Sequence, residues 1–120
     1  MPFRDQLETL VSTVRGVQGA IVLALDGEAV EWCGQSNGER LKLRAAYAGV
    51  VLQAARQLAR QLNSGTPRQL ILSYDGARLF VQELTAGYFL ILELDPSSNV
   101  GEAGHGIGPA IAILSQEIVG

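Results

Sequence analysis

Two segments of the chain read as an apolar run, an Asp-Gly pair and a second apolar run, and a single alanine-rich stretch separates them. The first segment covers residues 20–33 with its Asp-Gly pair at 26–27, and the second covers residues 70–83 with its pair at 75–76. Both residues of an Asp-Gly pair tolerate the positive φ of a type I′ turn, so each segment predicts a β-hairpin. The sequence therefore predicts two hairpins that flank one long helix.

The alanine-rich stretch carries clear signals for the ends of a helix. Ser36 with Glu39 forms a capping box at the start, and Gly65 followed by Pro67 ends the helix. A helix of about 25 residues spans about 37 Å. Two apolar stripes run along it, and one stripe would be enough to dock it on a sheet, so a second surface is expected to pack against it. The first stripe is Leu41, Ala45, Ala48, Leu52, Ala55, Ala59 and Leu62, and the second is Leu43, Tyr47, Val50, Ala54 and Leu58.

The rest of the chain supplies two more helices and a further strand. Residues 2–14 have the apolar spacing of a first helix, and residues 88–94 form a strand that is apolar on both faces, as is typical of a central strand. Residues 99–119 keep a helical apolar spacing. Gly104, Gly106, Gly108 and Pro109, however, are unfavourable in the interior of a helix. We expect one helix with a weak or kinked middle; the alternative is a helix that begins at Gly108.

The predicted element order is αββαβββα, within a single domain of residues 1–120. The sequence predicts an α+β fold with a five-stranded antiparallel sheet in the order 2-1-5-4-3. This prediction rests on the Asp-Gly turns, the short link at 85–87 and the fifth strand, which is apolar on both faces. Its third strand, residues 69–74, is then an edge.

Composition narrows the class of protein. The chain has 120 residues, a formal net charge of −3 and 18% charged residues, which argues against general binding of nucleic acid. Arg4 and Asp5 interrupt the start of the chain, so a signal peptide is not expected, and no apolar run is long enough to insert into a membrane. The single cysteine, Cys33, excludes an intramolecular disulfide, and the cytoplasm is the expected location.

No set of residues predicts catalysis, a cofactor or a metal site. His105 is the only histidine, and no Gly-x-Ser-x-Gly motif links it to Ser73 or to any other nucleophile. The glycines at 101–108 are followed by Pro-Ala, whereas a phosphate-binding loop ends in Gly-Lys-Ser/Thr. Asp26 and Asp75 are read as turn residues. We therefore expect a protein that is not an enzyme and that has no cofactor.

Five of the nine basic residues lie on the long helix, which has one acidic residue, Glu39. The simpler interpretation is a solvated outer face. The functional interpretation is an electropositive strip that steers an acidic partner surface. This candidate partner-binding strip is Arg40, Lys42, Arg44, Arg56 and Arg60.

The predicted edge strand at residues 69–74 has no charged residue, whereas the opposite edge carries Glu28 and Glu31. An uncharged edge strand pairs readily with another chain. We therefore predict a homodimer in which this strand pairs with its copy and the two long helices lie near each other. The candidate interface residues are Leu70, Ile71, Leu72, Ser73, Tyr74, Ala48, Leu52 and Ala55.

The order of these elements, with these turns, resembles the roadblock / dynein light chain family, which includes small bacterial proteins that regulate GTPases. The matching stretches are residues 16–20, 25–27, 75–76 and 99–101, and the resemblance covers nearly the whole chain. The segment at 104–109 departs from the family, which usually has an unbroken, charged helix there.

The resemblance implies a sheet with the long helix on one face and the terminal helices on the other. It also implies a dimer with a sheet continuous across two chains. The implied role is a non-catalytic partner of a Ras-like small GTPase, which it activates or scaffolds, or an adaptor subunit for a motor or scaffold. The alternative function is that of a small-molecule-binding sensory domain of the PAS or GAF type.

Overall fold

The computed structural model describes residues 2–24, 26–34, 38–85, 87–97 and 100–119. Its elements are α1 (Pro2–Thr13), β1 (Val17–Ala24), β2 (Ala29–Gly34), α2 (Gly38–Leu62), β3 (Gln69–Ser73), β4 (Arg78–Glu83), β5 (Tyr88–Leu94) and α3 (Val100–Val119). The strands form one antiparallel sheet in the order β2-β1-β5-β4-β3. The predicted α+β fold, its element order and its sheet order are confirmed.

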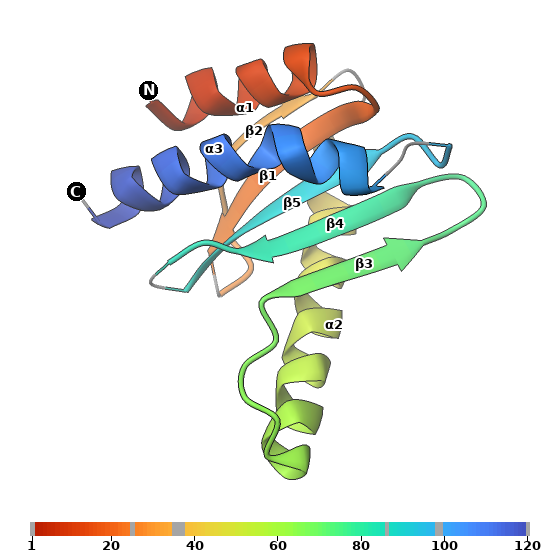
Figure 1. Ribbon diagram of the computed structural model, residues 1–120, viewed down its shortest axis with the longest axis vertical. Coiled ribbons are helices and arrows are strands. Elements are labelled where there is room, and N and C mark those ends of the chain that lie inside the picture. The colour runs from red at the N-terminus through yellow and green to blue at the C-terminus, as the bar shows by residue number, and fades with distance from the viewer. Residues whose placement is uncertain (1, 25, 35–37, 86, 98–99, 120) are drawn as a thin grey trace.

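The helices cover the two faces of the sheet unequally (Figure 1). α1 and α3 lie side by side on one face, where Leu7, Leu10 and Leu114 are fully buried. α2 alone covers the other face and crosses the strands steeply. The arrangement of the helices implied by the family resemblance is therefore confirmed.

β5 holds the two cores together from the centre of the sheet. Leu90 and Leu92 pack into the core under α1 and α3, whereas Phe89 and Ile91 pack into the core under α2. A strand covered on both faces needs apolar side chains at consecutive positions, and this requirement explains its unbroken apolar run. The predicted central position of this strand is confirmed.

Both Asp-Gly pairs lie at hairpin turns, but the predicted turn type is wrong. Gly27 has a φ of 92°, and its N–H donates to the Ala24 carbonyl, an arrangement typical of a three-residue loop with a glycine bulge. At the second turn Tyr74 N–H donates to the Ala77 carbonyl, and Gly76 lacks a positive φ. A type I′ turn needs positive φ at both central residues, and neither pair supplies it.

The two ends of α2 are formed by different local contacts. The capping Ser36 lies outside the described residues. At the first residue of the helix, Gly38, the ring of Trp32 lies so close that an added Cβ would be 2.5 Å from its Cη2 atom. At the other end Asn63, directly after the last helical residue, has a φ of 55°, and Gly65, the predicted stop, has a φ of 84°.

α3 is a single helix that contains Pro109, so the alternative of a helix that begins at Gly108 is wrong. Ile107, Ala110 and Leu114 are buried against the sheet and α1 at helical spacing. Tertiary packing of this apolar face outweighs the low helix propensity of the glycines and the hydrogen bond that proline cannot donate.

Two glycine substitutions are expected to change stability in opposite directions. Gly38→Ala displaces Trp32 and destabilises the fold by about 1–3 kcal/mol through overpacking. Gly76→Ala adds a methyl group at a turn residue without a positive φ, where no atom beyond its chain neighbours lies within 4 Å, and it stabilises the fold by about 0.4–1 kcal/mol. Urea denaturation followed by circular dichroism measures both values. Equal effects of the two changes would contradict the close contact at Trp32.

Candidate interaction surface

α2 is longer than the sheet that it crosses. Its buried side chains, Leu41, Ala45, Ala48 and Leu52, all lie in its first 15 residues. The C-terminal part of the helix runs past β3 and protrudes from the sheet, as Figure 1 shows. The first predicted apolar stripe is therefore the docking face as far as Leu52, and its end at Leu62 is exposed.

The second predicted stripe of α2 faces outward. Tyr47 and Val50 are 66% and 67% exposed, although each is large and apolar. Among the described residues, ten large apolar side chains are exposed, of which six lie on α2, one lies on β3 and one directly follows β3. Apolar patches of this kind on a soluble protein mark sites of interaction. The α2 members are Leu43, Tyr47, Val50, Val51, Leu58 and Leu62.

The exposed side chains of Ile71 on β3 and of Tyr74, which follows β3, extend this patch to the edge of the sheet. A hollow of about 380 Å³ joins the two elements, and its walls include Tyr47, Val51 and Leu72. We call the exposed apolar residues of α2, together with Ile71, Tyr74 and this hollow, the α2–β3 surface. It unites an apolar helix face with an edge strand of the sheet.

The residues predicted for the dimer interface divide between this surface and the core. Ile71, Ser73 and Tyr74 are exposed, and Leu70, Leu72 and Ala55 are half-buried. Ala48 and Leu52 are each 1% exposed, because they face the chain's own sheet. Their assignment to an interface is corrected: the stripe that faces outward is the one through Tyr47 and Val50.

The basic residues of α2 likewise have two different roles. Arg44 donates from Nη1 to Oε2 of Glu93, whose side chain is only 5% exposed. Arg56 donates from Nη2 to Oε2 of Glu83 and lies 4.9 Å from the ring centroid of Phe89. These two arginines fasten α2 to β4 and β5, so the prediction that they form part of an exposed strip is corrected.

The other three basic residues stay at the surface of α2. Lys42 lies 3.9 Å from Glu39 and 5.8 Å from the ring centroid of Trp32. Arg40 and Arg60 are exposed near opposite ends of the helix. The exposed positive charge is therefore split between the two ends of α2.

Sequence analysis missed the carboxylates that pair with Arg44 and Arg56. Glu93 is the only charged residue in the strand 88–94, and its position next to the apolar run at 89–92 is the signal that could have revealed it. A carboxylate beside a buried run needs a cationic partner. Glu83 carries a weaker signal, because it lies at the end of β4 and remains partly exposed.

The structure gathers no catalytic set within its described residues. Burial raises the pKa of the Cys33 thiol, which disfavours the nucleophilic thiolate. Asp26 serves its turn by accepting the Glu28 N–H at 3.0 Å, and Ser73 lies on the edge strand. The segment with His105 is part of α3. Across the described ranges no three His, Cys, Asp or Glu residues cluster as metal ligands, and no helix is long and apolar enough to span a membrane.

Comparisons with known proteins agree on the fold. The family model for the Roadblock/LC7 domain matches residues 4–93. A Roadblock/LC7 domain from Streptomyces avermitilis superposes with a TM-score of 0.86 at 19% identity, covering 96% of each chain. Myxococcus xanthus MglB gives 0.86 at 13% identity over 97% of this chain and 94% of that one. An MglB structure with a tetrameric arrangement gives 0.80 at 18% identity, over 96% and 88%. No curated protein matches by sequence.

The Arg44–Glu93 pair is expected to be strongly coupled in folding. Arg44→Met leaves a buried carboxylate without its partner and destabilises the fold by about 3 kcal/mol. Adding Glu93→Leu removes the stranded charge and restores most of that loss. A double-mutant cycle by urea denaturation, at constant protein concentration, measures the coupling.

The exposed Lys42 supplies the control for this cycle. Lys42→Met is expected to change stability by less than about 1 kcal/mol, because its contacts with Glu39 and Trp32 are at the surface. Strictly additive effects of the two changes at Arg44 and Glu93 would show that the pair is not what fixes the helix.

Proposed function

The chain belongs to the Roadblock/LC7 domain family, and from this we propose that it is a non-catalytic regulatory module that acts by binding other proteins. The observation that carries the proposal is the α2–β3 surface, where an outward apolar helix face lies beside the edge strand of the sheet. A surface of this kind supplies apolar area and backbone hydrogen-bonding groups for a partner. The alternative of a PAS- or GAF-type sensory domain finds no support, because the family match and the structural neighbours are Roadblock domains.

The first proposed partner is a second copy of the chain. β3 pairs antiparallel with its copy about a two-fold axis, which extends the sheet across both chains and satisfies the free edge groups. The outward stripe of α2 then packs near its copy across the same axis. Leu70, Ile71, Leu72, Ser73 and Tyr74 supply the strand contacts, and Ala55 lies at the margin of the helix contact.

The second proposed partner is a Ras-like small GTPase, which the module activates or scaffolds in the cytoplasm. The sequence resemblance to GTPase-regulating roadblock proteins motivates this step. Arg40 and Arg60, exposed on α2, are placed to steer an acidic surface of such a partner. Lys42 contributes at the edge, whereas Arg44 and Arg56 act by holding the helix in position.

The proposed dimer predicts that a charge on β3 separates the copies. Ile71→Lys places a like charge on both copies of the paired edge, and the chain becomes monomeric at micromolar concentration. Light scattering with size-exclusion chromatography measures the mass. In the monomer, the protruding half of α2 also loses protection from hydrogen exchange, because the second chain no longer packs over Leu58 and Leu62.

Val30→Lys is the matched control, since Val30 is an exposed apolar residue on β2, at the opposite edge of the sheet. The mass of this variant is expected to stay that of a dimer. A monomeric wild-type chain at micromolar concentration, or a dimer lost equally in both variants, would exclude pairing through β3.

The proposed GTPase contact predicts a change in the association rate. Arg40→Glu and Arg60→Glu together slow association by about tenfold, and the difference shrinks at high salt. Surface plasmon resonance measures the rates against the Ras-like GTPase recovered with the chain from cell extract, loaded with GDP or a GTP analogue. Arg15→Glu is the control, because this exposed arginine lies in the α1–β1 connection. Unchanged rates in the double variant would remove the ends of α2 from the contact.

A further inference from the structure

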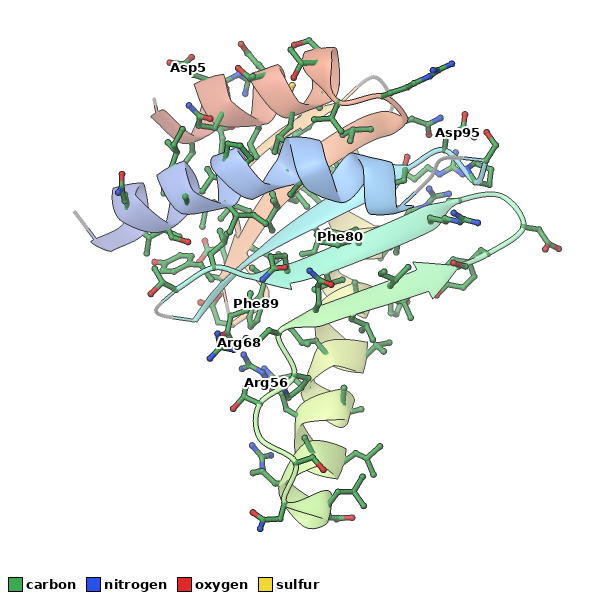
Figure 2. All side chains as sticks on the ribbon, viewed as in Figure 1. Asp5, Arg56, Arg68, Phe80, Phe89 and Asp95 are labelled. Carbon is green, nitrogen blue, oxygen red and sulfur yellow. The ribbon has the colours of Figure 1, made fainter. Side chains whose placement is uncertain are left out.

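A second hollow lies where α2 ends and the chain returns to β3. It has a volume of about 260 Å³ and is lined by Arg56, Arg60, Gly65, Thr66 and Pro67. In Figure 2, Arg56 and Arg68 are labelled in this region, beside the start of β3. The hollow is therefore distinct from the one inside the α2–β3 surface, which is lined by apolar and aromatic side chains around Arg44.

Positive charge exceeds negative charge at this corner of the molecule. Arg56 and Arg60 are one helical turn apart, a like-charge spacing that is unfavourable in an isolated helix. The carboxylate of Glu83 neutralises Arg56. The backbone N–H of Glu83 donates to the carbonyl oxygen of Arg68 at 2.9 Å, so Arg68 lies at the same corner. Two arginines thus line the hollow, a third lies nearby, and the carboxylate of Glu83 pairs with one of them, in a chain whose formal net charge is −3.

Some hydrogen-bond donors of the residues that line the hollow are not used by the fold. Among the described residues, Arg56 Nε is a buried side-chain nitrogen without a hydrogen-bond partner. Arg60 is exposed, and Thr66 adds a hydroxyl group. Guanidinium groups donate through a planar fork that fits the oxygens of a phosphate.

We propose that this hollow is a phosphate-binding site, filled by inorganic phosphate or by the phosphate group of a small phosphomonoester. Because Glu83 neutralises Arg56, the hollow keeps the charge of Arg60, with Arg68 nearby, and this excess of positive charge favours the binding of phosphate. The hollow is open to solvent, which leaves room for an organic group on the phosphate. Arg60 and Thr66 bind the oxygens, and Arg56 adds charge while staying bonded to Glu83.

An NMR titration of the whole chain with sodium phosphate tests the site, with chloride used to keep the ionic strength constant. We expect saturable shifts at the Gly65 and Thr66 amides and at the Nε–H groups of Arg56 and Arg60, with a Kd of about 1 mM. Arg60→Gln weakens binding by about tenfold. Arg40→Gln, the same change at the exposed start of α2, leaves the Kd within about twofold.

Further titrations identify the source of the phosphate group. Tighter binding of glycerol 3-phosphate than of inorganic phosphate assigns the site to a phosphomonoester, and the reverse order assigns it to free phosphate. Three results would overturn the proposal: acetate binding as tightly as phosphate, shifts spread over all arginines, or Arg40→Gln weakening binding as much as Arg60→Gln. None of these results depends on the proposed dimer or GTPase contact.

Discussion

The structure depends on how α2 is held against the sheet. Small side chains at Ala45 and Ala48 let the helix axis approach the strands closely, and Leu41 and Leu52 fill the space at either end of this row. Arg44 and Arg56 then reach the sheet from positions that flank the row and bond to Glu93 and Glu83. Because a buried carboxylate without a partner is strongly destabilising, Glu93 favours one position of the helix over any shifted one.

The position of α2 on the sheet determines which of its residues are exposed to solvent. The apolar stripe opposite the docking face must point to solvent, and the second half of the helix must pass beyond β3. The chain thus completes its two cores with its own residues, yet it leaves an apolar face and a free strand edge side by side. The polar hollow at the end of α2 arises from the same geometry, since the chain turns back there beside Arg56 and Arg60.

The order of the elements could be predicted from sequence because it is encoded in local patterns. Hairpin turns, alternating strands and the apolar run at 89–92 each involve neighbouring residues. The ion pairs could not be predicted in this way. Arg44 and Glu93 are 49 residues apart, and Arg56 and Glu83 are 27 apart, so only the crossing of α2 over the sheet brings them together.

The crossing of α2 over the sheet also explains why two residues predicted for the interface, Ala48 and Leu52, are buried. Two apolar stripes on one helix look equivalent in the sequence, and Ala48 was assigned outward although it is buried. The angle at which the helix crosses the strands decides which stripe faces the sheet. The turn types were wrong for a different reason, since an Asp-Gly pair permits a type I′ turn without requiring one.

The central pairing of the sheet has a consequence for how the chain folds. β1 and β5 are neighbours, yet the paired residues Ile21 and Ile91 are 70 positions apart along the chain. The β1–β2 hairpin and the β3–β4–β5 meander close short loops and can form early, whereas joining them requires the loss of far more chain entropy. During synthesis β1 emerges long before β5, so its inner edge stays open while most of the chain is made. Folding therefore ends with the closure of the middle of the sheet, and premature association is most probable at that seam before closure.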